Sequence, residues 1–333
     1  MTRSHVMNIL IVRLGALGDI VHAVPAVAAL RRALPEARID WVVERRHREV
    51  VDLVAGLRRR VSIDTSRWSS LVPGIRALRS ARYDIAIDLQ GLLKSAVLAR
   101  LSGARRVVGF DRSALREPAA ALFYRERHET DDRQHIIRKN LSLARVVAAV
   151  DDRIEFPLDV SGAEPQPGPY ALLNPGAAWP NKRWPPDRFG AVAGWLLATY
   201  GVRSLVLWGP GERALADAVA AASAGAAQAA PETRIGDVLA LARRAVLMIS
   251  GDTGPLHLAA AMGAPLVGLY GPTNPARNGP WEPDDVVVSR FDRCGCHYQR
   301  RCRQASACID SITVEDVRRA AAERLARAGV PRR

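Results

Sequence analysis

The sequence predicts an α/β protein with two doubly wound parallel-sheet domains that face each other across a crevice. Short apolar runs, each long enough for a buried strand, alternate with helix-forming segments along the chain. Polar or glycine-rich turns follow these runs, as they do at the carboxyl ends of parallel strands. Residues 157–169 combine prolines, glycines and acidic residues without periodicity, which is typical of a linker between two such series.

Length and composition suit this architecture. A chain of 333 residues with 48% hydrophobic residues can bury two full cores. We expect domains at residues 1–160 and 170–310, followed by a helical segment at residues 311–333. One arrangement of this segment is that it packs back on the first domain. No apolar run approaches the ~20 residues of a membrane span, and the opening residues lack the apolar centre of a secretion signal. A cytoplasmic location is therefore expected.

The chain is strongly basic, with a formal net charge of +14 and a pI near 10.6. Arginines cluster in the first half, including residues 58–60, 105–106, Arg112 and Arg116. They either coat a solvated face or bind an anionic membrane face or polyanionic substrate. Nucleic acid is disfavoured because no known binding module and no aromatic residues interleaved with the cations are found.

The first series opens with a strand at Asn8–Val12, a glycine-rich turn at 13–19, a helix at Ile20–Leu34 and a strand at Ile39–Val43. A dinucleotide site would need G-x-G-x-x-G after the first strand, but Arg13 stands at the first glycine position. A cation of that size fills the space of a pyrophosphate, which disfavours NAD.

Several polar turns of this series are predicted to meet at one edge of the sheet. Asp19 stands at the start of a helix, where it acts either as a helix-stabilising carboxylate or as a general base. A strand at Tyr83–Asp88 leads into a polar turn, and a strand at Val107–Phe110 is followed by arginines.

The second series is predicted from the same alternation. Strands are expected at Tyr170–Leu173, Ser204–Trp208, Val246–Ile249 and Pro265–Tyr270, and helices at Asp187–Tyr200, Ile235–Arg243, Pro255–Met262 and Val314–Ala328, with a long alanine-rich helix after Glu212.

The turn at 250–254 is the centre of the predicted ligand site. Amides of Thr253 and Gly254 at a helix N-terminus are a natural seat for a phosphate or diphosphate. Asp252 would repel a phosphate, so we expect it to face hydroxyl groups, such as those of a sugar.

Four cysteines form the pattern C-x-C-x5-C-x5-C at Cys294, Cys296, Cys302 and Cys308. Such a cluster raises the possibility of a metal site. The pattern lacks the C-x2-C pairs of a zinc knuckle, so our expectation is disulfides or free thiols on a surface loop, without a metal.

The chain resembles the bacterial lipopolysaccharide core heptosyltransferases of glycosyltransferase family 9, most of all the heptosyltransferase I group. The resemblance covers nearly the whole chain and rests on six stretches, LIVRLGALGDIVHAVPA, DWVVE, DLQGLLKSA, REPAAALFYRER, NPGAAWPNKRWP and SGDTGPLHLAAA. It implies a GT-B fold, with an acceptor-binding Rossmann-like domain followed by a nucleotide-sugar-binding one. It also implies an inverting, metal-independent transfer without a cofactor.

The resemblance further implies partners and residue roles. The donor would be ADP-L-glycero-D-manno-heptose, and the acceptor a Kdo-bearing lipid A at the inner face of the inner membrane, where the enzyme would be peripheral. Asp19 matches the proposed general base. The donor-binding positions are Lys182, Glu212, Thr233, Asp252, Thr253, Gly254 and His257, and the acceptor-side positions are Arg67, Arg116, Gln90 and Lys94. Ala177 and Ala178 replace hydroxyl residues of heptosyltransferase I, so contacts there would come from the backbone.

Other functions stay open at this stage. The acceptor could differ, as in a heptosyltransferase II-like or protein-directed enzyme. The chain could also be a non-catalytic binder or a nucleotide-sugar epimerase of related fold. A base at Asp19 argues against a pure binder, and the absence of a second catalytic set beside the donor turn argues against an epimerase.

Overall fold

The computed structural model describes residues 6–160, 168–302 and 306–333. The chain divides into two compact units, Met1–Asp159 and Val160–Arg333, here called the first and second units. Within the described ranges, no helix is both long enough and apolar enough to cross a membrane.

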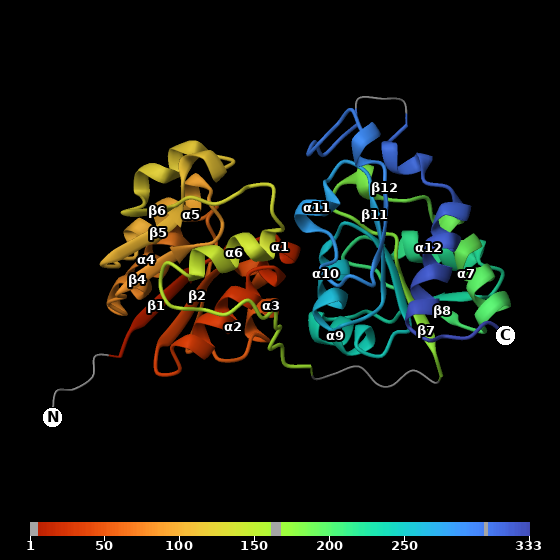
Figure 1. Ribbon diagram of the computed structural model, residues 1–333, viewed down its shortest axis with the longest axis horizontal. Coiled ribbons are helices and arrows are strands. Elements are labelled where there is room, and N and C mark those ends of the chain that lie inside the picture. The colour runs from red at the N-terminus through yellow and green to blue at the C-terminus, as the bar shows by residue number, and fades with distance from the viewer. Residues whose placement is uncertain (1–5, 161–167, 303–305) are drawn as a thin grey trace. The chain divides into compact units, whose positions relative to one another are not determined.

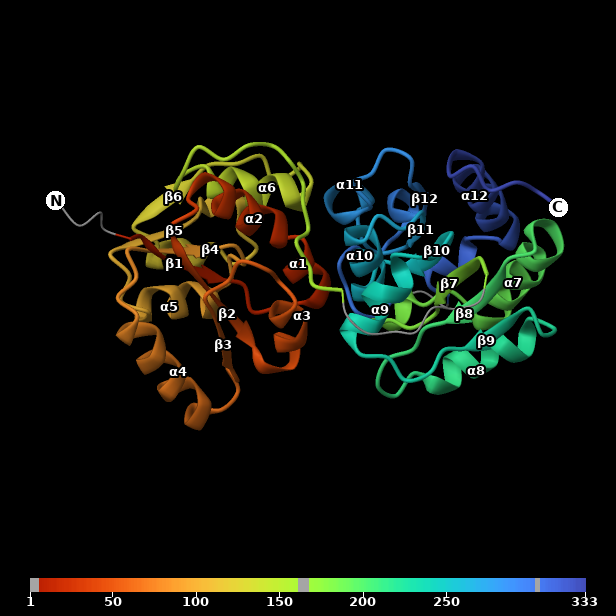
Figure 2. The ribbon, with the colours of Figure 1, turned by 90° about the horizontal axis from the view of Figure 1, so that it is seen from below.

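The first unit is built on one sheet of six parallel strands in the order β3-β2-β1-β4-β5-β6 (Figures 1 and 2). Because every neighbouring pair is parallel, all the carboxyl ends lie along one edge of the sheet. The strands are β1 (Asn8–Val12), β2 (Arg38–Glu44), β3 (Arg59–Ile63), β4 (Ile85–Asp88), β5 (Arg106–Phe110) and β6 (Glu126–His128).

Helices cover both faces of this sheet. Figure 2 shows α2 and α6 on one face, in contact with each other, and α4 and α5 on the other. The α-helices are α1 (Leu17–Val21), α2 (Val24–Ala33), α3 (Arg48–Asp52), α4 (Trp68–Ser80), α5 (Leu93–Leu101) and α6 (Ile136–Ala144). Short 3-10 helices are η1 (Arg45–His47), η2 (Arg112–Ala114) and η3 (Pro118–Phe123).

The single helix predicted at Ile20–Leu34 is wrong in detail, because the structure has two helices, α1 and α2. Pro25 lies in the first turn of α2. Proline has no N–H to donate, so it is tolerated in a first turn but would break a continuous helix. The break leaves α1 as a short element beside the glycine-rich turn.

The second unit repeats the architecture, with six parallel strands in the order β12-β11-β10-β7-β8-β9. All residues of β7, β10 and β11 are buried, as expected for strands covered on both faces. The strands are β7 (Tyr170–Asn174), β8 (Arg203–Val206), β9 (Ala227–Ala229), β10 (Leu247–Gly251), β11 (Leu266–Tyr270) and β12 (Val286–Ser289). The helices are η4 (Pro180–Lys182), α7 (Pro186–Tyr200), α8 (Arg213–Ala222), α9 (Ile235–Ala242), α10 (Gly254–Ala261), α11 (Pro275–Asn278), η5 (Phe291–Arg293), η6 (Cys308–Ser311) and α12 (Val314–Arg327).

The last helix, α12, belongs to the second unit. It contacts α7 and the strands β10, β11 and β12. Its buried side chains Val317, Ala321 and Leu325 join the same apolar core as Leu196. This differs from the arrangement in which the helix packs back on the first domain, because its apolar stripe is already covered within the second unit.

Candidate active-site residues

Asp19 lies in α1, after the glycine-rich turn at the carboxyl end of β1. One carboxylate oxygen forms an ion pair of 2.9 Å with Arg13, and the other accepts the Ala16 N–H at 3.2 Å. The Arg13 side chain is 6% exposed, whereas that of Asp19 is 43% exposed. The buried Arg13 side chain therefore orients the Asp19 carboxylate, which stays open to an incoming ligand. Both sequence-based interpretations of Asp19 remain available, because it stabilises the start of α1 and also faces solvent.

Arg13 explains why the turn does not follow the dinucleotide pattern. Its guanidinium is buried and donates to the carbonyl of Leu89 as well as pairing with Asp19. It ties the carboxyl ends of β1 and β4 together. A buried arginine thus stands at the position where the dinucleotide pattern has its first glycine.

Gln90 and Lys94 follow β4 at the same edge. Gln90 Oε1 accepts the Leu14 N–H at 2.7 Å, so this side chain holds the turn that leads to Asp19. Lys94 is exposed in the first turn of α5. The start of this helix is fixed by Glu117, whose carboxylate accepts the Leu93 N–H at 2.7 Å.

Arg67 and Arg116 are exposed on loops that follow β3 and β5, at the carboxyl edge that also carries Asp19. The Arg67 side chain is 74% exposed and reaches Asp64 at 3.5 Å. Arg116 directly precedes Glu117 and so lies beside the start of α5.

For Arg58, Arg59 and Arg60 the structure fits neither the alternative of anion binding nor that of a merely solvated face. They lie at the opposite edge of the sheet, where β3 begins. Arg58 and Arg59 both donate to the fully buried Asp40, at 2.6–2.9 Å. Arg60 donates to three backbone carbonyls, those of Val51, Val54 and Leu57. These arginines stabilise the fold.

His47, at the end of η1, is a residue that sequence reasoning missed. Its ring packs against Gly15, since a Cβ there would lie only 2.7 Å from His47 Cδ2. Burial and the nearby charge of Arg46 lower the pKa of His47, with further influence from Lys94, while Glu44 and Asp19 act in the opposite direction. A neutral imidazole therefore lines the Asp19 turn at neutral pH. Only its three-dimensional position reveals this, because nothing in the sequence around it forms a motif.

In the second unit, Lys182 and Asp252 form a nearly buried ion pair at the carboxyl ends of β7 and β10. Lys182 Nζ lies 2.5 Å from Asp252 Oδ2, with side chains 14% and 5% exposed. The ammonium also sits 4.5 Å from the centre of the Trp179 ring, a cation–π contact. Gly251 permits this arrangement, because a Cβ there would lie 2.6 Å from the Lys182 carbonyl oxygen.

The other oxygen of Asp252 accepts hydrogen bonds from His257 Nε2 at 3.1 Å and Asn278 Nδ2 at 2.8 Å. Burial acts to raise the pKa of Asp252, but the His257 hydrogen bond and the Lys182 charge outweigh it and hold the pKa well below its usual range. The sequence-based expectation that Asp252 faces sugar hydroxyls stays a prediction, to which the structure adds the three side chains that hold the carboxylate. Its carboxylate is already engaged, and it orients Lys182.

Glu212 lies after β8, at the N-cap position of α8. Its carboxylate accepts the Gly209 N–H at 3.2 Å and lies 3.4 Å from Arg183. It packs directly against Gly176, where a Cβ would lie 2.1 Å from Glu212 Oε2. The turn after β7 and the turn after β8 are thus joined by one carboxylate. Thr233, half-buried, lies in the loop between β9 and α9.

Thr253 is the N-cap residue of α10, and Gly254 is its first helical residue. The Thr253 hydroxyl lies 3.1 Å from both Asn174 Nδ2 and Ser250 Oγ. Asn174, which ends β7, also donates to the carbonyl of Gly176 at 3.1 Å. This polar network anchors the turn after β10 to the turn after β7, and it fixes the direction of the α10 N-terminus.

The cysteines differ from the expected surface loop. Cys294, Cys296 and Cys308 are buried, and their sulfur atoms all lie within 4.8 Å of one another.

Comparison with known proteins identifies the family. A family model described as glycosyltransferase family 9 (heptosyltransferase) matches residues 74–307, well over half of the chain. The chain belongs to glycosyltransferase family 9. The expected GT-B fold, with two doubly wound parallel-sheet domains, is confirmed for this enzyme.

Relatives of this family 9 enzyme are similar over most of their length. It is 30% identical to lipopolysaccharide heptosyltransferase 1 of Pseudomonas aeruginosa over 318 residues, covering 89% of this chain and 87% of the relative. It is also 30% identical to the Escherichia coli K12 protein of the same name, covering 84% and 93%. The E. coli heptosyltransferase WaaC with ADP superposes with a TM-score of 0.82 at 27% identity, covering 96% of this chain and all of WaaC. A second WaaC structure, with ADP-2-deoxy-2-fluoro heptose, gives a TM-score of 0.80.

Proposed function

We propose that this family 9 enzyme transfers L-glycero-D-manno-heptose from ADP-heptose to a Kdo-bearing lipid A in assembly of the lipopolysaccharide inner core. The observation that carries the proposal is Asp19, a carboxylate oriented by buried Arg13 and still 43% exposed. Family membership and the similarity to WaaC, described with ADP and with an ADP-heptose analogue, support the donor.

In the proposed reaction, the Asp19 carboxylate accepts the proton of the acceptor hydroxyl as its oxygen attacks the anomeric carbon. The bond from that carbon to the diphosphate oxygen breaks, and ADP leaves with the bonding electron pair. A single displacement inverts the anomeric configuration. The ion pair with Arg13 holds the Asp19 carboxylate in one orientation before the substrates bind. The side chain therefore loses no further rotational entropy during the reaction.

The departing diphosphate gains negative charge, and the second unit offers two ways to stabilise it. Lys182 is fixed by Asp252 and Trp179. The amino end of α10 supplies first-turn amides and a favourable dipole. These groups are preorganised, so they stabilise the developing charge without rearrangement. In this proposal they act without a metal ion, and Glu212 and Thr233 bind the nucleoside.

An anionic acceptor suits the first unit. Arg67, Arg116 and Lys94 lie exposed at the edge that carries Asp19. Arginine binds carboxylates and phosphates through a planar fork of donors, which fits the Kdo carboxylate and lipid A phosphates. With a net charge of +14, the enzyme would sit peripherally on the anionic cytoplasmic face of the inner membrane.

The activity is tested by incubating the enzyme with ADP-heptose and deacylated Kdo-lipid A. ADP release that requires the acceptor, together with a heptosylated product, supports the proposal. Release of isomerised heptose without acceptor would indicate an epimerase instead. Acceptance only of an already heptosylated core would move the enzyme to the heptosyltransferase II type.

The role of Asp19 is tested by Asp19→Asn, which keeps the shape of the side chain but removes the base. We expect kcat to fall roughly 10²–10⁴-fold with little change in the ADP-heptose KM. Asp52→Asn is the matched control, because Asp52 is also 43% exposed and paired with an arginine, at 3.1 Å. Equal, near-normal turnover in both variants would leave Asp19 as a helix-stabilising residue only.

A further inference from the structure

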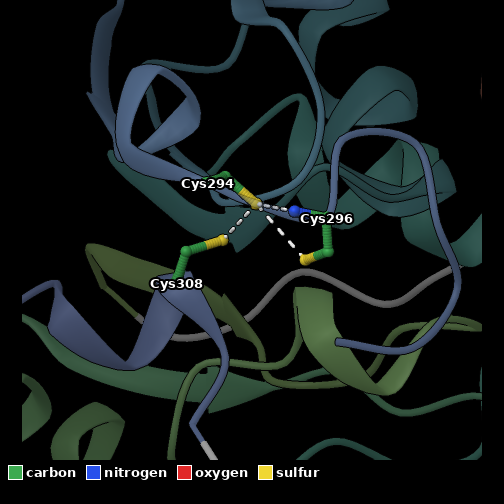
Figure 3. A group of neighbouring side chains, drawn as sticks. All are labelled: Cys294, Cys296 and Cys308. Carbon is green, nitrogen blue, oxygen red and sulfur yellow. Dashed lines mark hydrogen bonds between the residues drawn. The ribbon is translucent and has the colours of Figure 1, made fainter. Parts of the chain in front are cut away.

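A cluster of cysteine sulfurs lies in the second unit, outside the residues assigned to heptose transfer. Cys294 and Cys296 bracket one residue after η5, and Cys308 begins η6 (Figure 3). The Cys294 sulfur lies 2.8 Å from that of Cys308 and 3.3 Å from that of Cys296. All three side chains are at least nine-tenths buried and point toward one another.

The fourth cysteine is close at hand. Cys302 is partly buried and packs against the other three. It lies on the loop that connects Cys296 with Cys308. The chain thus brings four thiols together from positions up to 14 residues apart.

The mutual closeness of three sulfurs suits a shared ligand better than a disulfide, which joins only two of them. The separations of 2.8 and 3.3 Å lie between the ~2.05 Å of an S–S bond and the ~3.8 Å that separates thiolates bound ~2.3 Å from a tetrahedral metal. Side-chain rotations of well under 1 Å per sulfur would reach the metal geometry, since all three lie within 4.8 Å of one another. Tetrahedral sulfur sites of this kind select zinc or iron.

We propose that Cys294, Cys296, Cys302 and Cys308 bind one divalent zinc or iron ion, and that this ion fixes the turn that carries Lys182. With four cysteine ligands the metal has no open position for a substrate, so its role is structural. Arginines on the same loop, Arg293, Arg300 and Arg301, offset the negative charge of four thiolates.

The link to Lys182 runs through the preceding residue, Asn181. Its amide is 97% buried, donates to the carbonyl of Gln299 at 2.8 Å and lies 3.7 Å from the Cys296 sulfur. Asn181 and Lys182 belong to the same short helix, η4, which contacts η6. A metal that holds the cysteine loop therefore also holds η4. This second part of the inference rests on the proposed role of Lys182 in binding the donor.

The first experiment measures metal in full-length protein purified without a histidine tag. Elemental analysis is expected to find about one zinc or iron per chain, and to distinguish the two. Cys294→Ser, Cys296→Ser and Cys308→Ser should each lose most of it. The control is His297→Ala on the same loop, because His297 is exposed and stacks on Phe291, with ring centres 4.1 Å apart. Metal-free wild-type protein, or loss of metal in the control alone, would overturn the site.

The main arm of a second measurement uses wild-type protein, so it does not depend on whether a cysteine variant folds. Wild-type protein is treated with a chelator, and Co²⁺ is then added. The visible bands of tetrahedral Co²⁺ and the sulfur-to-cobalt charge-transfer bands should appear at one equivalent. Cys302→Ser should weaken or shift these bands, and unchanged bands in that variant would contradict a fourth thiolate ligand. An octahedral Co²⁺ spectrum, or disulfide-linked peptides on mass spectrometry, would contradict a tetrathiolate site.

The link to Lys182 is tested by ADP binding in calorimetry, a readout independent of any acceptor. Removing the metal should weaken ADP binding by about tenfold, as losses of supporting contacts around a site do. Asn181→Ala should weaken ADP binding similarly while metal content stays near one ion. Unchanged ADP affinity in both cases would refute the positioning role. A metal-loaded protein that binds ADP but transfers no heptose would instead contradict the proposed function and leave the metal site intact.

Discussion

At the scale of single residues, the Asp252 carboxylate determines how the side chains of the proposed donor site are arranged. It lies between Lys182 and His257, and its ionised form is favoured by both. A carboxylate beside a phosphate site would ordinarily repel the ligand, but here its charge is balanced by the lysine that it orients. The residue type could be predicted from the sequence as part of the donor turn, whereas its direction could not.

Lys182→Ala should lower kcat/KM for ADP-heptose by roughly 10²–10³-fold, the usual cost of removing one group that stabilises developing negative charge. Asp252→Asn should give a smaller loss of the same kind, because the lysine remains but is no longer held. Steady-state kinetics with varied donor and saturating acceptor measure both. A rise in the acceptor KM alone would show that Lys182 is misassigned.

Arg116→Ala should raise the KM of the Kdo-lipid A acceptor about tenfold, since one charge-assisted hydrogen bond on an exposed site is lost. The donor KM should change much less, and Arg116→Lys should restore only part of the effect. Arg105→Ala is the matched control, because Arg105 is 80% exposed at the opposite edge of the sheet, where it pairs with Asp84. Raising the salt concentration should weaken acceptor binding in the wild type. Identical constants for the two variants would mean that Arg116 only coats the surface.

His47 shows why sequence reasoning missed part of the site. It follows β2 by only a few residues, yet it contacts Gly15 in the turn after β1. Contacts of this kind depend on which carboxyl ends lie side by side. The alternation of strands and helices predicts the shared edge, but it does not predict which loop side chain reaches across it.

At the scale of elements, the amino ends of β2, β3 and β4 are held by one buried carboxylate. Asp40 accepts hydrogen bonds from Arg58, Arg59 and the Tyr83 hydroxyl, the last at 2.6 Å. Burial acts to raise the pKa of Asp40, but the hydrogen bonds from Arg58, Tyr83 and Arg59 outweigh it and the pKa is lowered. The cluster is structural and lies away from the Asp19 edge.

Asp40→Asn should reduce the free energy of unfolding by about 1–3 kcal/mol. This is below the ~3–5 kcal/mol for breaking a fully buried pair, because Arg58 and Arg59 are 31% and 41% exposed. A lowered pKa means that the stabilisation is present above the unfolded value of about 3.9 and is lost as the pH falls below it. Urea unfolding should therefore show a difference in the free energy of unfolding between variant and wild type that is smaller at pH 3 than at pH 7. A large change in acceptor KM with unchanged stability in Asp40→Asn would instead show that Arg58 and Arg59 bind the acceptor.

The same arginines are the reason why the sequence does not predict β3. Apolar runs predicted β1, β7, β10 and β11, because strands buried on both faces have few polar residues. β3 begins with two arginines, and four of its five residues are only partly buried. β9 has three residues and follows the alanine-rich α8, so its composition looks helical. Edge strands in both sheets carry a weak signal for this reason.

At the scale of the whole molecule, the residues assigned to the donor all belong to the second unit, and those assigned to the base and acceptor all belong to the first. The sequence predicts this division from the linker at 157–169. It does not predict where the last helix packs, because an amphipathic helix can cover any exposed apolar face.

A fragment of residues 160–333 should therefore fold and bind ADP, whereas a fragment of residues 160–311 should not. The shorter fragment lacks α12, so it exposes the core side chains that Val317, Ala321 and Leu325 cover. Circular dichroism and calorimetry with ADP measure folding and binding. Equal ADP affinity in both fragments would contradict the inclusion of α12 in the second unit.

The pairing of cations around the donor site has a consequence for inhibitors. Lys182 is matched by Asp252 and Arg183 by Glu212, so these four side chains contribute no net positive charge. A ligand at this position is therefore recognised mainly through directed hydrogen bonds and the dipole of α10 rather than through bulk charge attraction. Replacements of the pyrophosphate should therefore keep its acceptor geometry as well as a negative charge, because both the α10 dipole and the fixed Lys182 ammonium favour an anion at this one position.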